Sequence, residues 1–235
     1  MKKYSKQFSA LSLLLLLMFF ISCDNNEPLE LNNNLEFVPV GLIHNDLLSD
    51  LKASNAKFNT IQEVVDASKE LLKNNYTEFY NKYPSYDVNS IFIDSRRSLS
   101  EHNLVEQFEQ KGKELVENGL VPKSFYSFLH KFVSEKPDYN AMLNELENFK
   151  KENSNEISLN NNLSVMIATF EDMAYHSNNF WMNISNKSSQ RRADECDAAG
   201  YIADAATSAL LFWNPIGSII GGLAASYIAE ENCRE

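Results

Sequence analysis

Glycine and proline are scarce in this chain, which has seven glycines and six prolines among its 235 residues. Sustained alternation of apolar and polar residues, the pattern of a half-buried β-strand, is also missing. From Val40 onward the apolar residues instead recur at three- and four-residue spacing, as they do on one face of an amphipathic helix. These absences exclude a β-rich fold, and we expect an all-α protein.

Basic residues are outnumbered by acidic ones, with 21 Lys and Arg against 32 Asp and Glu and a formal charge of −11. An acidic surface repels the phosphate backbone of nucleic acids and favours basic ligands. We therefore expect no nucleic-acid partner, and we attribute the acidity mainly to solubility.

Long apolar runs are missing as well. The longest one covers residues 11–21, whereas about 20 consecutive apolar residues are needed to cross a bilayer core. It follows three lysines and ends at Ser22, which is the layout of a cleaved secretory signal. We interpret residues 1–22 as a signal peptide, whose removal would take away three lysines and change the formal charge from −11 to −14.

The end of this signal, Phe20-Ile21-Ser22-Cys23, resembles a bacterial lipobox, in which apolar residues and a small residue precede a cysteine. The resemblance implies that Cys23 becomes the lipid-modified first residue, so that a membrane is a partner through this lipid. It also implies a location in the cell envelope, and we expect the outer membrane of a Gram-negative bacterium, on either its periplasmic or its surface face. The alternative is a chance cysteine after an ordinary signal.

Residues 23–39 are polar and acidic and have no periodic apolar face, which is typical of a flexible tether. Residues 40–190 are expected to form an irregular bundle of about six helices, beginning near residues 40, 61, 98, 122, 138 and 163. The second is expected to run to residue 83, with a loop at 84–97 after it, and a polar segment at 183–192 is expected to separate the bundle from the C-terminal part. Predicted end signals include capping boxes at Thr60 and Ser98, a cap at Asp138 and a stop at Gly119.

Residues 191–235 differ in composition and predict a helical hairpin. Two apolar arms rich in small residues, 198–212 and 216–229, are joined at the turn signal Asn214-Pro215. Folding the chain about this turn places Cys196 beside Cys233, and export from the cytoplasm would allow the two thiols to oxidise. We expect a disulfide that closes the hairpin, with two free buried thiols as the alternative.

The second arm carries a small-residue ridge on which another helix could pack closely. Its members recur every four residues and are Gly217, Gly221, Ala225 and Ala229. One interpretation packs the hairpin into the bundle as its core, and Asp204 in the first arm favours it, because an unpaired charge adds a cost to insertion in lipid. The other makes the hairpin a membrane-active module that resembles some bacteriocins and meets a target membrane or a protein partner, with Arg191-Arg192 as a processing site that releases it.

Catalytic and cofactor motifs are also missing. The four histidines have no metal-type spacing, and the sequence contains neither a Cys-x-x-Cys pair, a phosphate-binding glycine loop nor a Gly-x-Ser-x-Gly elbow. We therefore expect no cofactor, no metal and no enzymatic activity. The leading hypothesis is an envelope lipoprotein with a binding or structural role, and the second is an antagonism factor that acts through the hairpin.

Residues 41–48, with Gly41, His44, Asn45 and Leu48, resemble a G-x-x-H-N-x-x-L element near the start of uncharacterised envelope lipoproteins. A helix with Ser177 to Trp181 and a small-residue-rich C-terminus accompany it in that group. The resemblance implies no activity. On an apolar helix face, His44 is interpreted as a core histidine whose polar atoms have partners, with Asn45 bonding a neighbouring loop. A small-ligand or partner site around His44 and Asn45 is the alternative.

The disulfide can be tested directly. We expect non-reducing mass measurement of the full chain to find Cys196 and Cys233 joined, and reduction to lower stability by about 4 kcal/mol, the chain-entropy value for a loop of this length. Two free thiols in the unreduced protein would contradict the prediction.

Overall fold

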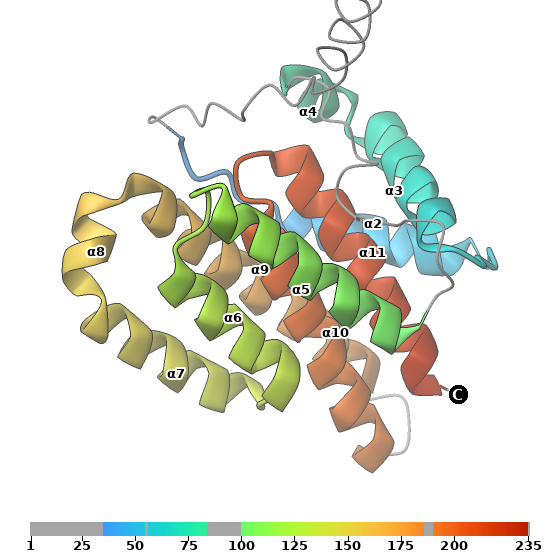
Figure 1. Ribbon diagram of the computed structural model, residues 1–235. Coiled ribbons are helices and arrows are strands. Elements are labelled where there is room, and N and C mark those ends of the chain that lie inside the picture. Colours follow the sequence, from blue (N-terminus) through green and yellow to red (C-terminus); the bar gives the residue numbers. More distant parts are fainter. Residues whose placement is uncertain (1–34, 55, 84–99, 186–189, 235) are drawn as a thin grey trace, which may run out of the picture. The chain divides into compact units, whose positions relative to one another are not determined.

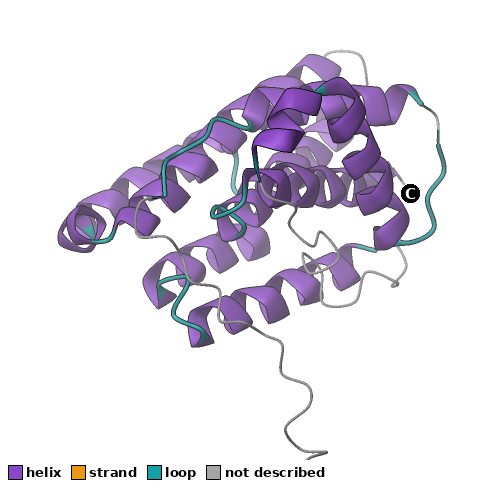
Figure 2. Cartoon of the chain, turned by 90° about the horizontal axis from the view of Figure 1, so that it is seen from above, coloured by secondary structure: helices purple, strands orange, loops and turns teal. Residues whose placement is uncertain are grey.

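The computed structural model describes residues 35–54, 56–83, 100–185 and 190–234, and the side chains of 35–54, 56–83, 100, 103–182 and 200–229. Within these residues the secondary structure is helical and contains no strand, as Figure 2 shows, so the prediction of an all-α protein is confirmed. Ten helices are present in this part of the chain: α2 (Gly41–Ala53), α3 (Ile61–Asn75), α4 (Thr77–Lys82), α5 (Glu101–Glu117), α6 (Lys123–Glu135), α7 (Tyr139–Glu152), α8 (Ser154–Leu159), α9 (Asn161–Ser185), α10 (Gln190–Leu210) and α11 (Pro215–Arg234).

The described helices before α10 number eight rather than the expected six. The helix predicted over 61–83 is broken at Tyr76, whose φ of −130° and ψ of 48° are not helical. The Tyr76 hydroxyl donates to Asp46 on α2 (2.7 Å), and burial together with this carboxylate raises the pKa of Tyr76 to about 12. The short helix α8 is additional, since the sequence indicated only a polar run between the helix that carries Phe149 and the one that begins near residue 163. Apolar periodicity does not report a break of one residue, because the spacing of the apolar positions continues across it.

The caps that the sequence indicates are largely present. Thr60 accepts a hydrogen bond from the Glu63 backbone N–H (3.3 Å), and Asp138 accepts one from Ala141 (2.8 Å). The N-cap residue of α5 is Ser100 rather than the predicted Ser98, because the helix begins at Glu101. The polar segment expected to separate the hairpin is also shorter than predicted, since α9 continues to Ser185 and α10 begins at Gln190.

The stop after α5 is a Schellman motif. Gly119 has a φ of 69°, its N–H donates to Val116 O (3.0 Å), and the Leu120 N–H donates to Leu115 O (2.9 Å). This arrangement gives partners to carbonyls that the helix end would otherwise leave without one.

The last two helices lie at the centre of the described bundle (Figure 1). Residues 211–214 join α10 to α11, and the two helices pack on each other. Helix α10 also packs on α9, α6 and α5, and α11 packs on α3, α2 and α5. Every α11 side chain from Ile216 to Ala229 is buried, because neighbouring helices cover the whole circumference.

Several predicted features lie outside the described residues. They are the signal and lipobox with Cys23, the greater part of the tether, and the expected loop at 84–97. The backbone at Arg191, Arg192, Cys196 and Cys233 is helical, but the side chains of these residues also lie outside the described set. The processing site and the disulfide therefore stay predictions.

Replacing Gly119 tests the Schellman stop. We expect Gly119→Ala to destabilise the protein by about 1 kcal/mol, because a Cβ disfavours the positive φ at this position. Nothing lies within 4 Å of the added Cβ, so the loss would come from the backbone alone. Gly119→Asn should lose less, since asparagine tolerates this conformation. Chemical denaturation of the three proteins gives the comparison, and an alanine variant as stable as the parent would contradict it.

Candidate functional site

His44 lies in the second turn of α2 and is completely buried, with an exposed fraction of 0%. Its Nε2 lies 3.4 Å from Oδ1 of Asp204, which is on α10 and is also 0% exposed. A histidine and an aspartate from segments 160 residues apart in the sequence thus meet in the core.

The second oxygen of Asp204 has its own partner. The hydroxyl of Ser177, on α9, donates to Oδ2 of Asp204. One carboxylate therefore contacts side chains from two other helices: Oδ2 accepts a hydrogen bond, and Oδ1 lies at ion-pair distance from His44.

These three residue types are those of a catalytic triad, but their order differs. In a nucleophilic site the serine bonds the histidine, which takes its proton, and the carboxylate orients the histidine. Here Ser177 bonds Asp204, which lies between the serine and His44. All three side chains are 0% exposed, so a substrate has no access to them in this conformation. The arrangement fits a structural cluster.

Asn45 fixes the other side of the histidine ring. Its Nδ2 donates to the backbone carbonyl of His176 on α9 (2.6 Å), and its Oδ1 lies 3.1 Å from Nδ1 of His44. Because the amide nitrogen is engaged with a carbonyl, the amide oxygen faces His44 and accepts its Nδ1–H. The predicted partner of Asn45 was a neighbouring loop, and the structure shows a helix instead.

Burial by itself lowers the pKa of His44, since a charged ring loses its hydration. The charge of Asp204 and the hydrogen bonds that the ring donates to Asp204 and Asn45 act in the opposite direction. As a result the pKa of His44 is raised above its ordinary value of 6.5. The surroundings of the ring therefore favour its protonated form.

Gly41 explains how α2 approaches α9 so closely. A Cβ at this position would lie 2.7 Å from Cδ2 of His176 and 2.9 Å from the backbone oxygen of Asp172. The Asp172 carboxylate accepts hydrogen bonds from the N–H groups of Val40 and Gly41, each at 2.8 Å. Helix α2 lacks a capping side chain of its own, and α9 supplies one.

Gly222 has the same role between α10 and α11. A Cβ there would lie 2.6 Å from Oγ of Ser208 and 3.2 Å from Cδ2 of His44. Ser218, one turn earlier, exchanges hydrogen bonds with Ser208, because the hydroxyl of each donates to the backbone carbonyl of the other (2.9 and 3.0 Å). The close contact with α10 thus includes Ser218 and Gly222, each one position beyond a member of the predicted ridge. The ridge residues are all buried: Gly217, Gly221, Ala225 and Ala229.

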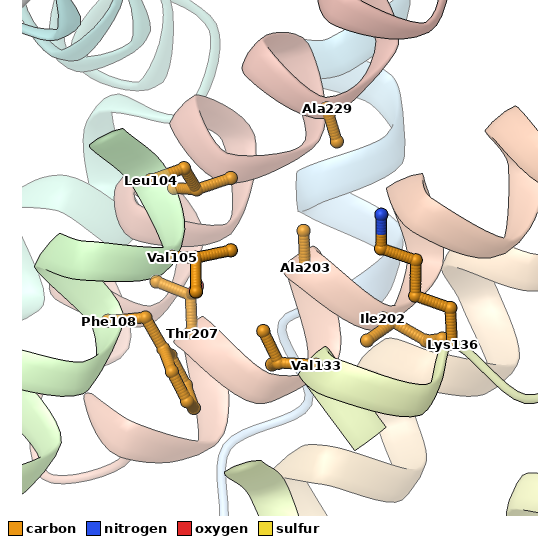
Figure 3. Close-up of a pocket in the computed structure, with 9 residues that line it drawn as sticks. All are labelled: Leu104, Val105, Phe108, Val133, Lys136, Ile202, Ala203, Thr207 and Ala229. Carbon is orange, nitrogen blue, oxygen red and sulfur yellow. The ribbon is translucent and has the colours of Figure 1, made fainter. Parts of the chain in front are cut away.

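A separate apolar pocket lies between α5, α6 and the two central helices (Figure 3). Val105 and Phe108 on α5 face Ile202 and Ala203 on α10 across it, and Lys136 lies at its edge. Its volume is about 40 Å³, far below the several hundred Å³ of an ordinary small-molecule site. The pocket does not contact His44 or Asn45 and is too small for a ligand of ordinary size.

Among the side chains that the structure describes, no three His, Cys, Asp or Glu residues gather closely enough to bind a metal ion. No described helix combines the length and the apolar character of a membrane span.

Fold and site together define an all-α protein with a buried polar cluster between its N-terminal and C-terminal helices. No protein-family model, curated protein or solved structure matches the chain.

The sequence singled out His44 and Asn45, and the structure brings both into the buried cluster. Asp172 belongs to the acidic pair Glu171-Asp172, a pattern typical of a solvated helix face, yet it accepts hydrogen bonds from the first N–H groups of α2. The contacts of Ser177 and Gly222 could not be predicted, because each depends on a neighbour that is distant in the sequence. Of the missed residues, Gly222 had the clearest available clue, as a glycine inside a helix often marks a close approach.

Replacing Gly41 tests the close packing of α2 on α9. We expect Gly41→Ala to destabilise the protein by about 1–3 kcal/mol, the usual cost of overpacking, because the methyl group meets backbone as well as a side chain. The neighbouring Leu42 is 66% exposed, so Leu42→Ala serves as the control and should change stability by less than about 0.5 kcal/mol. Equal losses of stability in the two variants, measured by thermal or chemical denaturation, would show that the packing of α2 on α9 does not require a glycine at position 41.

Proposed function

We propose that this chain is an envelope lipoprotein, anchored through a lipid on Cys23, whose helical domain has a non-enzymatic binding or structural role. The anchor rests on the likeness of Phe20 to Cys23 to a lipobox and on the signal before it. The non-enzymatic part rests on one observation, the complete burial of the His44, Asp204 and Ser177 cluster.

This burial matters because the cluster contains the residue types best suited to catalysis in the described part of the chain. A general base has to reach the proton that it removes from a substrate, to within about 3 Å or through one water molecule. Asp204 instead uses its oxygens for Ser177 and His44, and helices surround all three. These contacts stabilise the fold, and the complete burial of the three side chains keeps a substrate away from them.

A binding role is supported by large apolar side chains that remain exposed on α2 and α9. Leu42 is 66% exposed, Tyr175 55% and Met182 56%. Such side chains contribute strongly to protein interfaces when a partner covers them. They belong to helices that pack on each other, so one partner surface is able to reach both helices.

The hairpin favours this role over antagonism of a target membrane. The α11 residues from Ile216 to Ala229 are all buried within the bundle, so α10 and α11 would have to leave the core before they met a bilayer. That opening would also expose Asp204, which is costly in lipid. A membrane-active role therefore requires unfolding of the central packing as its first step.

The anchor is tested by replacing the cysteine. We expect the protein produced in a Gram-negative host to partition into detergent and to have the mass of a chain that starts at a lipid-modified Cys23. Cys23→Ser should abolish both the lipid and the cleavage, since the thiol is the site of attachment.

Cys196→Ser is the matched control, because it removes a different thiol and should leave the lipid in place. An unmodified parent protein, or a lipid that persists in Cys23→Ser, would contradict the proposed anchor.

A further inference from the structure

We propose that a proton held between His44 and Asp204 keeps α2 packed on α10 and α11, so that this packing loosens as the pH rises. The proposal concerns the described domain alone and does not depend on the lipid anchor.

The geometry requires this proton. Nδ1 of His44 faces the amide oxygen of Asn45, whose orientation is fixed by its bond to the His176 carbonyl, so Nδ1 carries a hydrogen. Nε2 faces Oδ1 of Asp204 at 3.4 Å. If neither Nε2 nor Oδ1 carried a proton, two lone pairs would face each other in the core. The pair therefore holds one proton, and the raised pKa of His44 places it on the ring.

Among the side chains that the structure describes, Asp204 is the charged group that acts on His44, and the other ionisable side chain of this part of α10, Tyr201, donates to the Pro137 carbonyl instead. On α9 the nearest ionisable groups, Asp172 and His176, pair with each other at 3.6 Å and are partly exposed. The described part of α11 offers the Gly222 backbone, and its one ionisable side chain is Tyr227, whose hydroxyl donates to Ala56 O (3.3 Å).

The remaining ionisable groups near α2 point outward. Helix α3 turns apolar side chains and Ser68 inward, and its charged residues are at least partly exposed. Asp46 and Asp50 on α2 itself are exposed and bond Tyr76 and Asn75. Loss of the proton on His44 thus leaves the buried carboxylate of Asp204 with only the Ser177 hydroxyl.

The consequence is local, because the pair is a main polar link from α2 to the centre. The apolar residues Leu47, Leu48 and Leu51 of α2 lie further along the helix and stay buried whether or not the pair is protonated. The segment most affected is the start of α2, from Gly41 to Asn45, where a small loss of attraction leaves the helix end less firmly held.

The sign of the effect follows from the direction of the shift. The pKa of His44 is raised in the folded protein, so the stabilisation is complete below about pH 6.5 and is lost as the pH rises through the folded value. Within that window one proton is released on unfolding, and the unfolding equilibrium constant should rise by up to about tenfold per pH unit.

The test uses the full-length protein. We expect the NMR titration of the His44 ring to have a midpoint above 6.5, and hydrogen exchange of α2, corrected for intrinsic rates, to accelerate with pH more than that of α7. A midpoint at or below 6.5, or equal acceleration in the two helices, would overturn the proposal.

Variants separate this pair from other titrating groups. His44→Gln should remove the pH slope of unfolding across the window, whereas His130→Gln, at a half-exposed pair with Glu109 (3.2 Å), should keep it. If His44→Gln does not fold, the NMR titration and the hydrogen exchange of the parent protein still test the proposal. A slope that survives in a folded His44→Gln protein, or that His130→Gln removes equally, would count against the pair.

Discussion

The buried contact between His44 and Asp204 is the constraint on which the rest of the structure depends. A carboxylate in a core is strongly destabilising unless it has charge or hydrogen-bond partners. Those partners come from α2 and α9, so the position of Asp204 on α10 fixes where both helices lie. The polar cluster thus contributes specificity of packing, while the surrounding apolar side chains contribute most of the stability.

Small residues make this cluster geometrically possible. Gly41 lets α2 reach the backbone of α9, and Gly222 lets α11 approach both Ser208 and His44. In a helix a glycine costs about 1 kcal/mol relative to alanine, so its presence is explained by the contact that it permits. The small-residue composition of the C-terminal helices is accounted for by packing inside the protein, where neighbouring helices cover α11 on all sides.

The G-x-x-H-N-x-x-L element has a structural meaning at each of its named positions. Gly41 contacts α9, His44 contacts α10, Asn45 bonds a carbonyl of α9, and Leu48 is fully buried. Each residue type is explained by a contact with another helix. This account supports a domain built for stable packing, presented at a membrane by a lipid on Cys23, as proposed.

The sequence by itself determined the helical class, most of the helix ends and the inward faces of the helices. These features depend on local spacing and on caps within four residues, as at Thr60, Asp138 and Gly119. It also identified His44 as a core residue, because the ring falls on the same side of its helix as Leu47, Leu48 and Leu51. The sequence could not show that Tyr76 breaks a helix.

Only the tertiary structure decided which residues meet. Asp172 caps a helix more than 130 residues away, and Ser177 and Asp204 complete the surroundings of His44 from two different helices. A periodic pattern reports which side of a helix faces inward, but it carries no information on the neighbour that lies there. The partners of buried polar groups are set by the packing of whole helices, which is why the cluster became visible only in three dimensions.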